Sequence, residues 1–196
     1  MRIAGFVTLL VVAAIALGCP PAGAAGGPVL VLGDSLAVGL RPFLGDMLGG
    51  REVVWDARTG RTTPQGMARL RADLAQVAPA TVVVSLGTND GADPSRFTSR
   101  MQRLLLALPP TACVVWPAIY RPPRKGPYEA LNRVLRRQAL RDPRFVVPRW
   151  DVVVLRGEVR LPDGLHPDQF GFRHRSRIIA SAIDRRCALG AVTASN

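Results

Sequence analysis

Continuously apolar stretches alternate along the chain with stretches in which apolar residues recur every three or four positions. A short continuous apolar run is typical of a strand buried in a parallel sheet, and the second spacing is typical of a helix with one buried face. The pattern predicts strands at 28–32, 52–57, 81–86, 112–116 and 145–147. It predicts helices at 37–48, 64–77, 94–108, 128–140 and 168–185. Such a β–α alternation implies a five-stranded parallel sheet with helices on both faces.

The two ends of the chain differ in composition from the middle. Arg2 precedes a charge-free apolar stretch at 3–17, and small residues and prolines follow it, which is typical of a signal peptide. We therefore expect a signal peptide at 1–25, one domain at 26–187 and a C-terminal tail at 188–196.

The way in which this leader is processed stays open. The segment 22–24 has the A-x-A pattern of an ordinary cleavage site, whereas 16–19 resembles a lipoprotein box that would lipidate Cys19 and anchor the protein. A permanent N-terminal anchor helix is a further alternative. In the first two cases the mature protein is exported to the periplasm, the cell wall or the medium.

The charge balance is strongly basic. Lys and Arg number 26 against 14 acidic residues, a net charge of +12, and Lys125 is the only lysine. This excess favours an anionic cell-wall polymer or membrane surface as surroundings. No nucleic-acid-binding motif is present, and we expect no nucleic-acid partner.

A disulfide is expected between Cys113 and Cys187, the two cysteines that remain after loss of the leader. Export permits disulfide formation. Cys113 begins the predicted fourth strand, and Cys187 follows the last helix, which runs antiparallel to the strands and ends at the same edge of the sheet.

Polar motifs follow the predicted strands. Ser35 lies in Gly-Asp-Ser-Leu after the first strand, Gly60 follows the second, and Asn89 lies in Gly-Thr-Asn-Asp after the third. His166, in Asp-Gly-Leu-His-Pro, precedes the last helix. Ligands of such sheets bind at the carboxyl ends of the strands, so these residues are expected to converge there.

The residue types suit nucleophilic acyl transfer. Ser35 would be the nucleophile and His166 its base, with Asp163 orienting the imidazole. Asp151 is a rival for the orienting acid, and the other histidine, His174, lies among arginines typical of a solvated helix face. The simpler alternatives are that the serine and the histidine only cap helices.

The oxyanion of such a reaction needs hydrogen-bond donors. We expect them from the backbone N–H groups of Ser35 and Gly60 and from the side-chain amide of Asn89. Asp34 and Asp90 are expected to brace the loops.

A basic, proline-rich loop at 121–127 follows the fourth strand and should overhang the same edge. We expect four cations to rim the cleft and to favour anionic substrates or surfaces, namely Arg61, Arg121, Arg124 and Lys125. The alternative is that they are ordinary solvated surface charges.

In the order of these motifs, residues 29–185 resemble the SGNH (GDSL) hydrolase superfamily, whose signature residues would be Ser35, Gly60, Asn89 and His166. The resemblance implies a three-layer α/β/α, flavodoxin-like fold, no metal or cofactor, and hydrolysis or transfer of acyl esters. The segment 60–70 is similar to periplasmic thioesterase/lysophospholipase members, whereas the pair Gly60-Arg61 is more similar to domains that move acetyl groups on cell-wall polymers.

The expected function is that of an exported, monomeric serine esterase that hydrolyses carboxylic esters. Its substrate would be a small ester or an acylated polymer or lipid. The alternatives are an O-acetyl esterase or acetyltransferase acting on cell-wall polysaccharide, a thioesterase or lysophospholipase, and a non-catalytic binding protein with the same fold.

Overall fold

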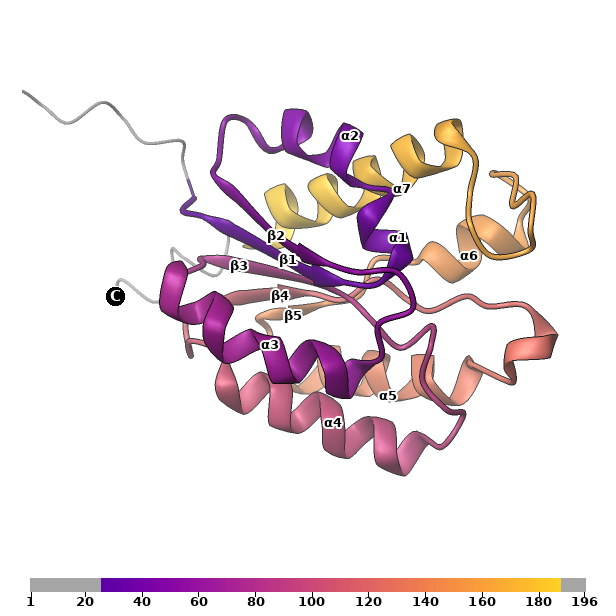
Figure 1. Cartoon of the computed structure of the whole chain (residues 1–196), viewed down its shortest axis with the longest axis horizontal. Coiled ribbons are helices and arrows are strands. Elements are labelled where there is room, and N and C mark those ends of the chain that lie inside the picture. Colours follow the sequence, from indigo (N-terminus) through magenta and orange to yellow (C-terminus); the bar gives the residue numbers. More distant parts are fainter. Residues whose placement is uncertain (1–25, 188–196) are drawn as a thin grey trace, which may run out of the picture.

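Five parallel strands form the sheet at the centre of the computed structural model, which describes residues 26–187 (Figure 1). The strands are β1 (Val29–Gly33), β2 (Val53–Ala57), β3 (Thr81–Ser85), β4 (Cys113–Val115) and β5 (Phe145–Val146). Their order is β2-β1-β3-β4-β5 and each adjacent pair is parallel, which confirms the predicted three-layer α/β/α fold. The predicted leader at 1–25 and tail at 188–196 lie outside the described residues.

Helices cover both faces of this sheet (Figure 1). One face carries α1 (Ser35–Val38), α2 (Arg41–Leu44) and α7 (Gln169–Ala182). The other carries α3 (Thr63–Gln76), α4 (Pro94–Ala107) and α5 (Glu129–Arg141). Three shorter helical segments are the turns Gly45–Leu48, Pro123–Lys125 and Ile183–Cys187, and α6 (Trp150–Leu155) precedes the Asp163–His166 segment.

Alternate residues of β1 enter the two cores. Leu30 and Leu32 pack in the cluster that contains Phe97 of α4, whereas Val29 and Val31 pack in the cluster on the α7 side. All four residues are completely buried, as expected for a strand in the middle of a parallel sheet. The carboxyl ends of β1 and β3 are therefore held rigidly side by side, and it is there that the chain's polar motifs begin.

The structure differs from the prediction in one divided helix and one additional helix. The helix expected at 37–48 is divided into α1, α2 and the turn Gly45–Leu48. At the break, α7 approaches so closely that a Cβ on Gly39 would lie 2.1 Å from the Phe172 ring. The helix α6 was not predicted, because its apolar run has no helical spacing.

Cys113 and Cys187 are joined by a disulfide, the expected pairing. The bond links the start of β4 to the turn that follows α7, 74 residues further along the chain. Within residues 26–187, no helix is both long and apolar enough to cross a membrane.

Candidate active site

Ser35 lies where β1 turns into α1. The preceding residue, Asp34, caps this helix, because its Oδ1 accepts the backbone N–H of Leu36 at 2.9 Å. Ser35 is the first residue of α1 and is only partly buried, so its hydroxyl is accessible.

Asp163 and His166 come from one tight turn before α7. Asp163 Oδ1 accepts the backbone N–H groups of Leu165 at 2.9 Å and His166 at 2.7 Å, and Gly164 adopts a φ of 79°. The other carboxylate oxygen, Oδ2, lies 2.6 Å from His166 Nδ1. These hydrogen bonds, the imidazole first, hold the pKa of Asp163 well below its ordinary value, so the carboxylate is ionised.

The imidazole joins this carboxylate to Ser35. His166 Nε2 lies 2.8 Å from Ser35 Oγ, across 131 residues of sequence. An ionised carboxylate only accepts hydrogen bonds, so His166 Nδ1 carries the proton and Nε2 presents its lone pair to the serine hydroxyl. This arrangement can withdraw the proton of Ser35 as the oxygen attacks an acyl carbon.

The expected oxyanion donors gather at the same sheet edge. Gly60 lies in a turn after β2 with a φ of 76°, and the turn begins beside β1, where Arg58 N–H donates to the Gly33 carbonyl at 3.1 Å. The side-chain NH₂ of Asn89 is 3.2 Å from the Arg61 carbonyl and 3.4 Å from Asp34 Oδ2. The loops after β1, β2 and β3 therefore interlock around Ser35.

The two aspartates of the motifs stabilise loops. Asp34 is completely buried, and burial raises its pKa to about 6. Asp90 Oδ1 accepts the backbone N–H of Thr63 at 2.9 Å, which joins the Asn89 loop to the first turn of α3.

Asp151, the alternative to Asp163 as the acid that orients the imidazole, pairs with arginines elsewhere in the protein. It is buried, with its Oδ2 hydrogen-bonded to Arg136 and its Oδ1 3.7 Å from Arg149. Asp163, and not Asp151, is the carboxylate on the imidazole of His166.

Two of the four cations assigned to the cleft rim do not face it, so that part of the prediction is wrong. Arg61 is 5% exposed and pairs with the Asp56 carboxylate at 2.6 Å. Arg121 is 1% exposed and donates to the backbone carbonyls of four residues, Gly87, Asp90, Gly126 and Pro127. Arg124 and Lys125 are exposed and reach the site, donating to the Asp163 carbonyl at 3.0 Å and to Asn89 Oδ1 at 2.9 Å.

Arg175 is a residue that the sequence analysis missed. Its guanidinium is buried 4.9 Å from the centre of the Trp150 ring and donates to Ser85 Oγ at 3.2 Å, and burial lowers its pKa to about 10. The positions of its neighbours on the same face of α7 indicate that Arg175 is buried. Gly171 and Ile179 lie four positions before and after Arg175, and both are buried.

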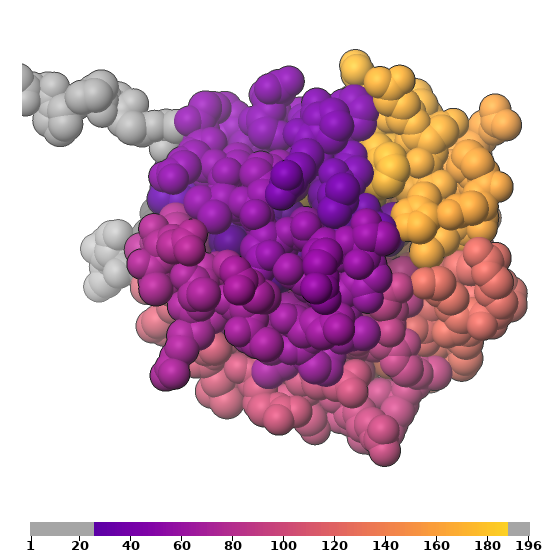
Figure 2. Space-filling view, viewed as in Figure 1, coloured from indigo at the N-terminus to yellow at the C-terminus, as the bar shows by residue number. Residues whose placement is uncertain are grey.

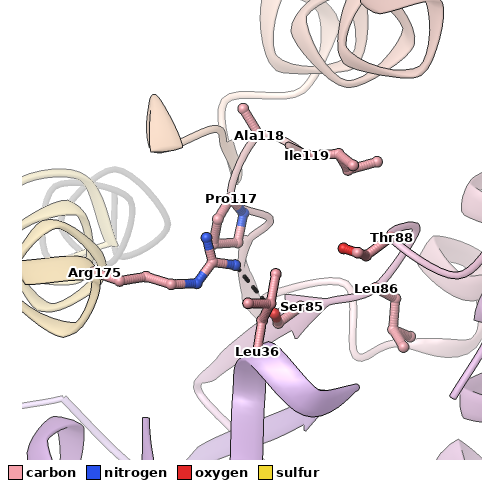
Figure 3. A pocket seen from close by; sticks show the side chains of 8 residues that line it. All are labelled: Leu36, Ser85, Leu86, Thr88, Pro117, Ala118, Ile119 and Arg175. Atoms are coloured by element: carbon pink, nitrogen blue, oxygen red, sulfur yellow. Dashed lines mark hydrogen bonds between the residues drawn. The ribbon is translucent and has the colours of Figure 1, made fainter. Parts of the chain in front are cut away.

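A small pocket is lined by neighbours of the site motifs, and Ser35 and His166 are not among its lining residues (Figure 3). Leu36 and Thr88, the chain neighbours of Ser35 and Asn89, line one part of it, and Arg175 enters from α7. The empty space is about 180 Å³, including its open mouth. The other lining residues are Ser85, Leu86, Pro117, Ala118 and Ile119.

Comparisons with known proteins identify the family. The chain is 30% identical over 161 residues to an arylesterase of Vibrio mimicus, covering 71% of this chain and 79% of that protein. It is 32% identical over 164 residues to the esterase TesA of Pseudomonas aeruginosa, with coverage of 74% and 81%.

Among solved structures, the chain is similar in fold to the C-terminal catalytic domain of peptidoglycan O-acetyltransferase A from Streptococcus pneumoniae. The TM-score is 0.66 and the identity 22%, with 83% of this chain and 94% of that one covered. The sequence model of the GDSL-like lipase/acylhydrolase family matches residues 31–174. The protein is therefore a hydrolase that belongs to the GDSL-like lipase/acylhydrolase family.

Proposed function

We propose that the protein is a serine esterase that cleaves carboxylic esters through an acyl-enzyme on Ser35. The observation that carries this proposal is the continuous chain of contacts from Ser35 Oγ to His166 at 2.8 Å and from His166 to Asp163 at 2.6 Å. Each atom in the chain has the donor or acceptor character that proton transfer requires.

In this mechanism Ser35 Oγ attacks the ester carbonyl while His166 Nε2 takes its proton, and Asp163 stabilises the imidazolium that forms. The oxyanion is held by the N–H groups of Ser35 and Gly60 and by the amide of Asn89. His166 then protonates the departing alcohol, which leaves an acyl-serine. A water molecule, deprotonated by His166, attacks this ester and releases the acid and the free hydroxyl of Ser35.

Replacing the nucleophile tests the mechanism. Ser35→Ala should lower the hydrolysis of p-nitrophenyl acetate by several orders of magnitude, because it removes the covalent route. Ser99→Ala, at an exposed position on α4, is the control and should keep full activity. Retention of more than a few per cent of activity by Ser35→Ala would remove Ser35 from this role.

A second candidate function is the removal or transfer of O-acetyl groups on a cell-wall polysaccharide. It is supported by the likeness in fold to the peptidoglycan O-acetyltransferase domain. Exposed Arg124 and Lys125 would attract such an anionic polymer. Release of acetate from acetylated peptidoglycan at a rate exceeding that for simple acetate esters would favour the esterase form, and acetyl transfer to added glycan would favour the transferase.

The proposed location is outside the cytoplasm, on the strength of the leader pattern at 1–25. The mass of the mature protein tests this location. Cleavage after residue 24 gives an unmodified protein, whereas lipidation gives a diacylglyceryl group on Cys19. A mature protein that retains residues 1–25 in a soluble cell extract would contradict export.

A further inference from the structure

The loop between β4 and α5, residues 116–128, contacts two separate parts of the active site. Its exposed residues Arg124 and Lys125 donate to the Asp163 carbonyl and to the Asn89 side chain. In the space-filling view this segment lies directly against the C-terminal part of the chain that carries His166 (Figure 2). The loop is thus placed to influence both the acid–base pair and the oxyanion donors.

Arg121 holds this loop in place. Its buried guanidinium donates to the carbonyls of Gly87 and Asp90, on either side of Asn89, and to those of Gly126 and Pro127 in its own loop. Separating the buried Arg121 guanidinium from these acceptors would cost free energy. The loop at 116–128 and the loop that carries Asn89 should therefore move as one unit. The backbone that carries Lys125 is therefore held in a fixed position relative to Asn89.

The contacts of Asn89 determine how its amide is oriented. Lys125 Nζ donates to Asn89 Oδ1 at 2.9 Å, and Asn89 Nδ2 donates to the Arg61 carbonyl at 3.2 Å. An ammonium group only donates and a carbonyl only accepts, so exchanging the amide oxygen and nitrogen would place donor against donor and acceptor against acceptor. The pair of contacts locks the NH₂ group on the side of Asp34, the residue that precedes Ser35.

We infer that Lys125 is a positioning residue for the oxyanion donor Asn89. The ammonium fixes the amide in its donating orientation and draws electron density toward Oδ1, which strengthens the N–H groups as donors. This inference rests on the proposed function, in which Asn89 binds the oxyanion. Because the oxyanion exists only in the transition state, Lys125 should act on kcat and leave KM unchanged.

A double-mutant cycle on p-nitrophenyl acetate, a neutral ester, tests the inference. Lys125→Met should lower kcat about tenfold with KM within twofold, a magnitude suited to a hydrogen bond that involves a charged group. Lys125→Arg should restore most of the loss, since it keeps a cationic donor. In the Asn89→Ala background, whose own loss is roughly 10²–10³-fold, Lys125→Met should change kcat by less than twofold.

Arg137→Met is the control for the loss of a positive charge, because Arg137 is exposed on α5. It should leave kcat and KM unchanged, and thermal melting should show that all variants fold. An equal loss from Lys125→Met in both backgrounds would overturn the inference, as would an effect confined to KM or no effect on kcat.

The failure of the inference is distinguishable from failure of the proposed function. If Ser35→Ala is inactive but the cycle is additive, only the role of Lys125 is lost. If Ser35→Ala remains active, the esterase mechanism itself fails and the inference fails with it.

Discussion

Asp163→Asn changes one atom of the site and should nearly abolish its activity. The carboxylate uses Oδ1 for two backbone N–H groups, those of Leu165 at 2.9 Å and His166 at 2.7 Å. An asparagine keeps these two bonds only by placing its carbonyl oxygen there. Its NH₂ group then faces His166 Nδ1 in place of Oδ2.

This exchange imposes the wrong tautomer on the imidazole. Facing a donor, Nδ1 must give up its proton, so that the proton moves to Nε2 and the lone pair toward Ser35 is lost. The same change in a serine protease costs roughly 10⁴-fold in kcat. Asp163 and His166 have side chains 52% and 37% exposed, so water can partly relieve the mismatch here. We therefore expect a loss of about 10³-fold, or about 4 kcal/mol in activation free energy.

The assay is kcat/KM for p-nitrophenyl acetate, combined with thermal melting to show that the turn stays folded. Asp168→Asn is the matched control, because Asp168 caps α7 through the Gly171 N–H at 2.9 Å and asparagine caps helices equally well. The control should keep wild-type activity. A folded Asp163→Asn protein with activity within tenfold of wild type would refute the tautomer argument.

Three further predictions concern buried charge, the disulfide and the cationic rim. Relative to the wild type, Asp34→Asn should gain up to about 3 kcal/mol in the free energy of unfolding as the pH rises from below 4 to above 6, because burial raises the pKa of Asp34 from 3.8 to about 6. In urea titrations the gain should shrink as pH falls to 4, where the folded protein already holds this proton, and a pH-independent gain would contradict the cause. Reduction of the Cys113–Cys187 bond, with its 74-residue separation, should lower the free energy of unfolding by about 4 kcal/mol in the chain-entropy model, and an unchanged urea midpoint would refute this. Arg124→Gln should lower kcat/KM for an anionic ester severalfold at low salt and less at 1 M salt; an equal loss for a neutral ester would exclude steering.

The fold was predictable because its signals are local. The buried strand β3 has a continuously apolar centre at 82–84, and the cap of α4 at Asp93 is followed directly by a proline. The helix expected at 37–48 is divided shortly before Pro42, which lacks the backbone N–H that a continuous helix would use there. The apolar spacing by itself does not show this break.

The site was predictable in its polar motifs and not in its arginines. Parallel topology brings the ends of β1, β2 and β3 together, so Ser35, Gly60 and Asn89 could be placed from sequence alone. The burial of Arg61 and Arg121 depends on which oxygens their guanidinium groups meet, and those of Arg121 include carbonyls 31 and 34 residues away. The net charge of the sequence includes such arginines, although their guanidinium groups are buried and hydrogen-bonded inside the protein.

The central claim is that Ser35 is a nucleophile activated by His166, and covalent labelling tests it most directly. A fluorophosphonate probe should add one phosphonyl group per molecule, as intact mass shows, and peptide mapping should place it on Ser35. Ser35→Ala should take up no label, and His166→Ala should react more slowly by orders of magnitude because the hydroxyl loses its base. A folded wild-type protein that takes up no label, carries it on another residue, or reacts as fast without His166 would contradict the account.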